Sequence, residues 1–410
     1  MERVGGFVCQ SIFYPVKSNN NEKWNGTETL AYKNRQSLSL KAMNFSQKKQ
    51  VIAPSLSQKM TNMSFCCAFL VVTLHVGMPE EGTGGICWFF FHFLCDVLGR
   101  VAVPFFFLAS GFFLAGHMSE AGWYAREMKK RVHSLLCPYV FWQALYAVYL
   151  IPLAVGANLV SRREWNWNIH ISDVVHVFGL DFTHNPGIPF FWFLRWLICL
   201  CVASPLLYWL LRKGRFWVVL AAYGFAVLKN MGVFGFQPDG WWWPWKWILH
   251  PFGTFYFLSG MAWRMGTFPQ CMPCLKQIVL WLGSGWLTAK TILLVACGFS
   301  LPGIGGWFLP IQYFPGHDEF LYPAILYAVW RFIPAGKWPT WLTDASFGMY
   351  AGHAFFTHFI DSIMWFSRLG MSSWQMFMFK WLVSFAGTIG GVALARKHVP
   401  TVARFLLGGR

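Results

Sequence analysis

A histidine lies near the end of an apolar segment, at position 75 in the string FLVVTLHVGM. Imidazole changes its protonation state near neutral pH. His75 can therefore serve as a general base, or as a nucleophile that accepts an acyl group. The alternative is a structural histidine at a membrane interface, hydrogen-bonded to water or to a neighbouring helix. The residue taken alone leaves both interpretations open.

Four other ionisable side chains stand out inside apolar segments: Arg100, Arg195, Lys290 and His353. A charged side chain at the centre of a bilayer costs ~2.5–3.5 kcal/mol on insertion scales, so such residues usually face the interior of a helix bundle and have partners. Arg100 cannot lose its proton, and Asp96, four residues earlier on the same helix face, is its expected partner. A structural ion pair and a functional role for Arg100 both stay open, and Lys290 is assigned no role.

A basic cluster follows the second apolar segment and consists of Arg126, Lys129, Lys130 and Arg131. One interpretation is a topology anchor at the lipid headgroups. The other is a binding site for a soluble polyanion, such as the phosphates of coenzyme A.

Ten apolar segments position these residues. Several of them match the ~20 residues that a helix needs to cross a bilayer. They lie near 62–78, 87–116, 135–156, 189–211, 215–233, 247–264, 276–299, 320–335, 343–366 and 374–395. The sequence therefore predicts an all-α polytopic integral membrane protein with about ten transmembrane helices.

The composition agrees with a membrane protein. Of 410 residues, 56% are hydrophobic and 12% are charged, whereas soluble domains carry about 25% charged residues. The net charge of +17 is explained by basic loops on the cytosolic side, so we expect no nucleic-acid partner. The 11 cysteines form no framework, and the CxxC pair of Cys271 and Cys274 lacks the second pair of ligands that a zinc site needs, so no metal is expected.

The distribution of Lys and Arg predicts the orientation. Residues 1–60 form a basic, polar tail without the apolar core of a signal peptide, and we expect this tail to be disordered and cytosolic. Residues 61–396 form the membrane domain, and residues 397–410 form a short cytosolic tail. Alternating basic loops place both termini in the cytosol of a multi-pass protein of the plasma (inner) membrane.

Six strings together resemble the integral-membrane acyltransferase 3 family. They are the segment ending at His75, RVAVPFFFLASG from Arg100, Lys130-Arg131 with the later CPY at 137–139, PFFWFLR at 189–195, FLSGM at 257–261 and ASFGMYAGH ending at His353. Their order covers residues 62–395. The resemblance implies about ten transmembrane helices and transfer of an acyl group, usually acetyl, from cytosolic acyl-CoA to a carbohydrate or envelope glycan.

The resemblance also implies roles for particular residues. His75 matches the family's essential first-helix histidine, and Arg100 and the basic cluster would handle the donor or the developing charge. One position departs from the family pattern: an Arg or Lys is typical eleven residues before that histidine, where this chain has Ser64. Lys59, sixteen residues before His75, is the nearest cation, and either it substitutes or another cation does.

We therefore expect a membrane-embedded O-acyltransferase. Coenzyme A would dock on Arg126, Lys130 and Arg131, His75 would activate a glycan hydroxyl, and Arg100 or Arg195 would stabilise the oxyanion, with His353 also at the substrate site. Acyl-CoA would be a co-substrate and no cofactor would be tightly bound. Membrane lipid, a carbohydrate acceptor and a polysaccharide-synthesis complex are the expected partners. The alternatives are a secondary transporter or flippase for a lipid-linked sugar or anion, and a non-catalytic scaffold.

Overall fold

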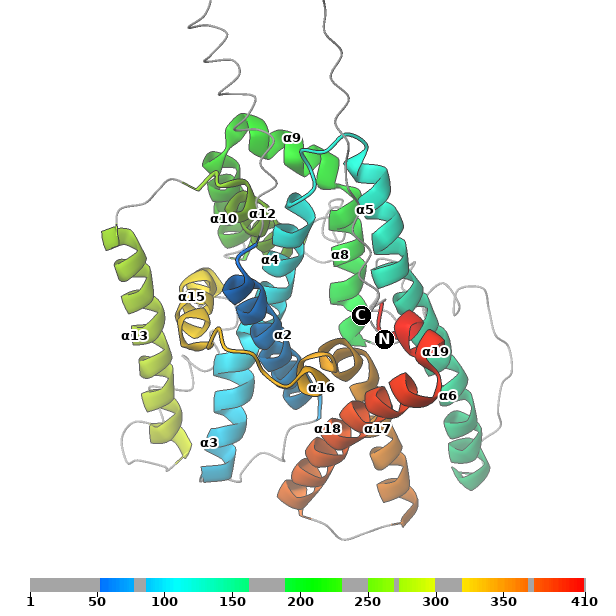
Figure 1. Ribbon diagram of the computed structural model, residues 1–410. Coiled ribbons are helices and arrows are strands. Elements are labelled where there is room, and N and C mark those ends of the chain that lie inside the picture. The colour runs from blue at the N-terminus through cyan, green and yellow to red at the C-terminus, as the bar shows by residue number, and fades with distance from the viewer. Residues whose placement is uncertain are drawn as a thin grey trace, which may run out of the picture. The chain divides into compact units, whose positions relative to one another are not determined.

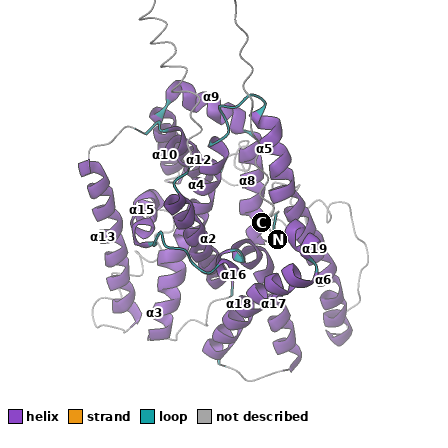
Figure 2. Cartoon of the chain, viewed as in Figure 1, coloured by secondary structure: helices purple, strands orange, loops and turns teal. Residues whose placement is uncertain are grey.

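The computed structural model describes residues 52–76, 86–161, 189–230, 250–268, 273–298, 319–367 and 372–408. These ranges all fall within one compact unit, Gln50–Arg410. They are mostly helical, with short loops, and contain no strand (Figure 2), which confirms the predicted all-α class for this part of the chain. The predicted tail before residue 52 and the cysteine at position 271 lie outside the described ranges.

Each of the ten predicted apolar segments coincides with one or more helices (Figure 1). The first half of the chain contains α2 (Pro54–His75), α3 (Ile86–His92), the π-helical turn η1 (Phe93–Leu98), the 3-10 turn η2 (Gly99–Val101), α4 (Ala102–Ala115), α5 (Trp123–Arg131), the π-helical turn η3 (Val132–Leu136) and α6 (Cys137–Ser161). The middle contains η4 (Pro189–Phe191), α8 (Trp192–Val202), α9 (Ser204–Gly214), α10 (Phe216–Asn230), α12 (Pro251–Met265) and α13 (Pro273–Gly298). The last part contains η5 (Glu319–Leu321), α15 (Tyr322–Phe332), α16 (Thr340–Thr343), α17 (Ser346–Ser367), α18 (Ser373–His398) and α19 (Pro400–Leu406).

Fewer helices than predicted meet the requirements for crossing a membrane unaided. Two described segments are long and apolar enough, Trp88–Ala115 and Trp374–His398. The pair α8 and α9, bent by 63°, would make a third if it is one span. Helices such as α15, with 11 residues, reach only about 16 Å, roughly half the thickness of the hydrocarbon core. The total of ten crossings and the cytosolic termini therefore stay predictions.

The bend between α8 and α9 has a local cause. Pro205 has no backbone N–H, and its ring conflicts with the carbonyl four residues earlier, that of Cys201. The hydroxyl of Ser204 donates to this carbonyl at 2.6 Å. The Ser-Pro pair thus replaces a helical hydrogen bond with a side-chain bond and redirects the chain.

The tightest helix packing joins α4 and α12 at two glycines. A Cβ atom on Gly111 would overlap the carbonyl of Phe257, and one on Gly260 would overlap the carbonyl of Leu108. The two backbones can approach this closely only because both positions lack a side chain. Two of the strings that carry the family resemblance therefore meet at this single crossing.

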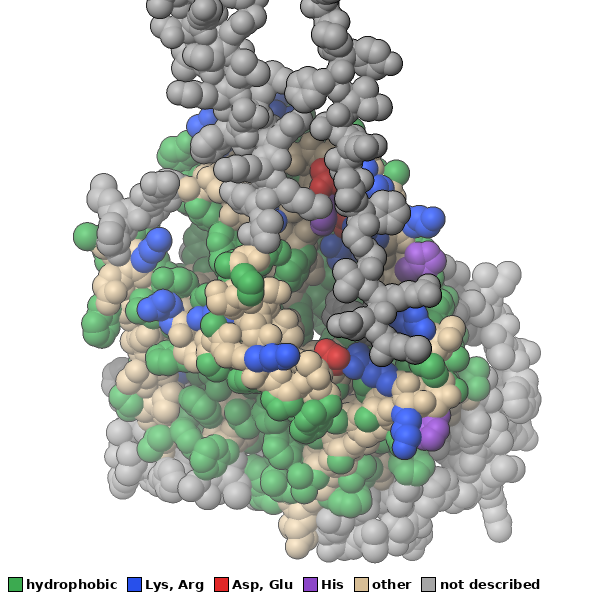
Figure 3. All heavy atoms as spheres, viewed as in Figure 1, with side chains coloured by type: hydrophobic (Ala, Val, Ile, Leu, Met, Phe, Trp, Pro, Cys, Tyr) green, Lys and Arg blue, Asp and Glu red, His purple; other side chains and the backbone are tan. Residues whose placement is uncertain are grey.

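Apolar side chains remain exposed over much of the described surface (Figure 3). Among the most exposed are Phe332 at 76%, Trp217 at 72% and Trp281 at 68%. Many exposed large apolar side chains are typical of a surface that contacts lipid or another protein. Inside the bundle, α2 packs against α17, α4 and α18, and its C-terminal end carries His75.

Candidate functional site

The C-terminal end of α2 brings together two of the histidines singled out in the sequence. His75 is the last residue of α2, and its side chain is exposed. Its ring centroid lies 5.4 Å from that of His353 on α17, with 29° between the ring planes. It lies 5.1 Å from the ring of Phe190 in η4. Segments far apart in the sequence thus converge on His75.

His353 has a defined hydrogen-bonding state. It is fully buried, and its Nδ1 lies 3.0 Å from the carbonyl oxygen of Met349 and 2.9 Å from that of Tyr350. Carbonyl oxygens only accept, so this geometry assigns the proton to Nδ1. In the neutral ring Nε2 then carries a lone pair, and within the described residues this atom has no hydrogen-bond partner. A buried polar atom of this kind beside an exposed histidine is a candidate for positioning or charge stabilisation.

Phe190 is fixed in place by a neighbouring tyrosine. The buried Tyr350 hydroxyl donates to the carbonyl of Phe190 at 2.9 Å, and the Phe190 ring lies 4.3 Å from that of His353. Arg195 follows on α8 and is buried, with 5% of its surface exposed. The structure therefore places this predicted site residue on α8, the helix that follows Phe190 of η4.

Arg100 lies on η2, next to the end of α2. Its neighbour Gly99 faces Leu74, the residue before His75. The Arg100 side chain is 55% exposed, and its Nη2 lies 3.6 Å from Oδ1 of Asp96. The expected pairing with Asp96 is confirmed. Asp96 is shared, because its Oδ2 also lies 2.5 Å from Nδ1 of His92.

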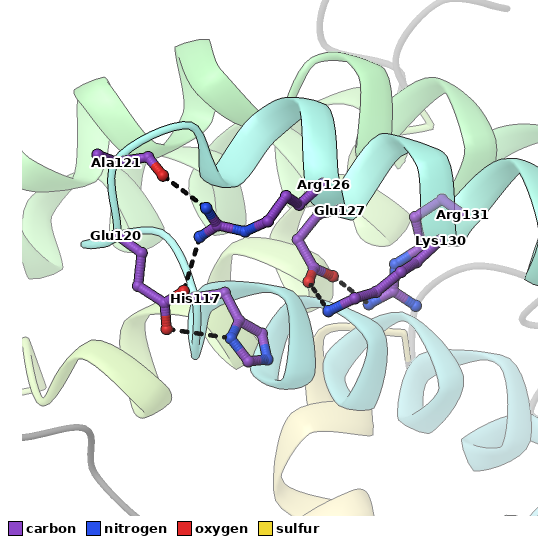
Figure 4. A network of polar contacts seen from close by, with 7 residues as sticks. All are labelled: His117, Glu120, Ala121, Arg126, Glu127, Lys130 and Arg131. Carbon is purple, nitrogen blue, oxygen red and sulfur yellow. Dashed lines mark hydrogen bonds and ion pairs between the residues drawn. The ribbon is translucent and has the colours of Figure 1, made fainter. Parts of the chain in front are cut away.

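The basic cluster separates into two parts (Figure 4). Arg126 closes the turn before α5, donating to the carbonyl of Ala121 and to the carboxylate of Glu120, each at 2.7 Å. Lys130 and Arg131 point instead toward the buried carboxylate of Glu127, at 2.6 Å and 3.8 Å. These contacts give Arg126 a structural role in the turn, which the sequence did not distinguish from the roles of its neighbours.

Lys130 and Arg131 line a cavity of about 340 Å³ near the start of α2. Its other lining residues are Ile52, Phe113, Gly116, His117, Glu127, Ser134 and Arg264, and Arg126 is absent from this set. Three cationic side chains therefore face one carboxylate, so the cavity favours an anion. His117 and Arg264 were missed by sequence reasoning. The only signal for Arg264 was its place in the last turn of an apolar segment.

Neither Ser64 nor Lys59 supplies a cation beside His75. The Ser64 hydroxyl donates to the carbonyl of Met60 at 2.9 Å. The Lys59 ammonium lies 4.8 Å from the ring centre of Trp330, and burial, together with the nearby Arg331, lowers the pKa of Lys59. Lys59 precedes His75 by sixteen residues on one helix, a rise of about 24 Å, compared with about 16 Å for a residue eleven positions before it. Substitution by Lys59 and substitution by another cation both stay open.

Comparison with known proteins identifies the family. The family model described as an acyltransferase domain (Acyl_transf_3) matches residues 61–396, most of the chain. No curated protein and no solved structure gives a significant match. The matched residues include His75, His353, Arg100, Arg195, the basic cluster, and the two glycines at the crossing of α4 and α12. The chain therefore belongs to the acyltransferase 3 family of membrane proteins, as the six strings predicted.

Proposed function

We propose that the protein transfers an acyl group, acetyl in the simplest case, from acyl-CoA to a hydroxyl of an envelope or cell-surface glycan. The observation that carries this proposal is the pairing of the exposed His75 with the buried His353, whose Nε2 has no hydrogen-bond partner among the described residues. An accessible imidazole at the end of a helix fits the general base or acyl acceptor that such a transfer needs.

His75 is the group that meets the substrate. In one route it takes the proton of the acceptor hydroxyl as that oxygen attacks the thioester carbonyl, and the thiolate of coenzyme A leaves. In the other, His75 attacks the thioester carbonyl itself and the thiolate of coenzyme A leaves; the acyl group then passes from the imidazole to the hydroxyl, whose proton goes to the thiolate. Both routes place positive charge on His75, and the neutral His353 ring, 5.4 Å away, adds no competing cation. Arg195 or Arg100 would stabilise the oxyanion, the kind of interaction that is usually the largest in acyl transfer.

The cavity near the start of α2 is the proposed donor site. Lys130, Arg131 and Arg264 line it, and charge-assisted hydrogen bonds from such groups suit the phosphates of coenzyme A. The 22 residues of α2 rise about 33 Å between this end and His75. The acyl-bearing arm must therefore extend along the bundle, which is consistent with a donor entering from the cytosol and an acceptor approaching from the opposite side of the plasma membrane.

The test uses the full chain in proteoliposomes with [14C]acetyl-CoA and an envelope glycan fraction. Label should pass to the glycan, and His75→Ala should abolish the transfer while the protein inserts and folds normally. Lys130→Ala should raise KM for acetyl-CoA with little change in kcat, because it lies at the donor end. Full activity of His75→Ala would refute the mechanism. Solute counterflow without transfer of label to the glycan would instead favour a transporter.

A further inference from the structure

The helix α9 lies across the end of α8 instead of continuing it (Figure 1). The two helices meet at an angle of 63°. Each has 11 residues and is therefore about 16 Å long. At this angle α9 advances only about 7 Å along the direction of α8. Most of its length therefore runs sideways, over the end of the bundle.

The inner face of α9 is held by the protein. Leu207 and Leu211, one helical turn apart, are both buried. Between them in the sequence, the ring of Tyr208 lies 6.0 Å from the ring of Trp123, the first residue of α5. These contacts fix the rotation of α9 about its own axis. The opposite face of the helix is therefore turned away from the bundle.

The outer face of α9 exposes apolar and basic side chains together. Leu206 is 58% exposed and Trp209 is 50% exposed. The exposed Arg212 and Lys213 follow three and four residues after Trp209, and residues at this spacing share one side of a helix. Exposed apolar and basic side chains on one short helix are typical of a segment that lies at a membrane surface.

The pairing of Trp209 with Lys213 restricts the depth of this face. The Lys213 ammonium lies 4.6 Å from the ring centre of Trp209, and the Arg212 guanidinium lies 5.9 Å from that of Tyr208. A charged side chain is costly in hydrocarbon, whereas Trp and Tyr rings concentrate at headgroup depth. Because each cation contacts its ring, one depth must suit both groups. The headgroup layer is the depth that does.

We propose that α9 lies in the headgroup layer of the membrane and binds anionic phospholipids through Arg212 and Lys213. Both cations are exposed, and no carboxylate among the described residues pairs with either of them. The phosphate of an anionic lipid is the complementary charge that a membrane supplies at this depth. The proposal is independent of the acyl-transfer reaction, because neither the histidine pair nor the donor cavity includes a residue of α9.

The depth of α9 is tested on the full chain in nanodiscs that contain one of two photoreactive phosphatidylglycerols. The first carries a diazirine in the headgroup, and the second carries it at the end of an acyl chain. Peptides of α9 should be labelled by the headgroup probe and hardly by the chain-end probe. Peptides of α18 supply the internal control, because this helix is long and apolar enough to cross a membrane and should react with the chain-end probe.

Two outcomes of this labelling would overturn the proposal. Stronger labelling of α9 by the chain-end probe would make α9 the second half of a bent span. The absence of α9 labelling by both probes, with α18 labelled, would show that something other than lipid covers its outer face.

A pair of variants tests the recognition of charge. Arg212→Gln and Lys213→Gln should each lower the preference of α9 for phosphatidylglycerol over phosphatidylcholine headgroup probes about fivefold, the effect of one basic residue near an anionic surface. Lys276→Gln is the matched control, since it removes an exposed cation from a different helix, α13, and it should keep the preference of the parent protein. An unchanged preference in both α9 variants would also overturn the proposal.

Discussion

Replacing His353 by phenylalanine should separate catalysis from folding. The ring volume is nearly kept, so packing against Phe190 at 4.3 Å and His75 at 5.4 Å persists. The substitution loses one N–H bond, shared between two carbonyls, which costs about 0.5–1.5 kcal/mol. It also removes a buried nitrogen with no hydrogen-bond partner among the described residues, and with it a desolvation penalty of about 1–3 kcal/mol. The free energy of unfolding should therefore fall by no more than about 0.5 kcal/mol and could rise by up to about 2.5 kcal/mol.

Activity should fall much further. A general base accelerates the reaction about 10²–10⁴-fold. A residue that only positions this base cannot contribute more to the rate than the base itself. We expect kcat for His353→Phe to fall about 10²-fold, equivalent to about 2.7 kcal/mol. KM for acetyl-CoA should be unchanged, because the donor cavity lies at the other end of α2.

The assay pairs label transfer in proteoliposomes with thermal unfolding in detergent. His358→Phe is the matched control, since it makes the same change on the same helix at an exposed position, and it should retain full activity. If His353→Phe kept kcat within threefold of the parent protein, His353 would be a packing residue and the positioning argument would be refuted.

Four substitutions test other parts of the structure. Arg126→Ala should leave KM for acetyl-CoA within about twofold of the parent value. Lys130→Ala should raise KM at least about tenfold, because it loses one charge-assisted hydrogen bond to the donor. A larger rise in KM for Arg126→Ala than for Lys130→Ala in steady-state kinetics would contradict the division of the basic cluster. Gly260→Leu should destabilise the protein by about 3 kcal/mol or more in thermal unfolding, because the new side chain would overlap a backbone carbonyl, and an unchanged midpoint would show that α4 and α12 are further apart. Asn62→Leu removes two N–H donations, 2.9 Å and 2.8 Å long, to the 334–336 loop and should cost about 1–3 kcal/mol; no loss of stability would show that the loop is held by other contacts.

Much of the helical framework could be predicted from the sequence. Long apolar runs identify helices, because a backbone in lipid must satisfy its hydrogen bonds internally. They do not say where a helix breaks, and so Ser204-Pro205 was placed inside one predicted segment that the structure bends by 63°. Short helices such as α15 also show that an apolar run need not cross the membrane alone.

The site was predicted as separate residues rather than as an arrangement. His75 and His353 were both identified by their cost at membrane depth, but their proximity depends on packing between α2 and α17, which one sequence does not encode in any local pattern. The basic cluster was treated as a single site because its charges are adjacent. Only side-chain directions distinguish Arg126 from Lys130, and Arg264 reaches the cavity from another helix.

The crossing of α4 and α12 has a consequence for genetic suppression. The obstacle facing a larger residue at Gly111 or Gly260 is a carbonyl oxygen of the other helix, and every amino acid carries that atom. No side-chain replacement on the partner helix can therefore restore the space. A selection for revertants of Gly260→Leu should return glycine or another small residue at the original codon, and second-site suppressors on α4 should not appear.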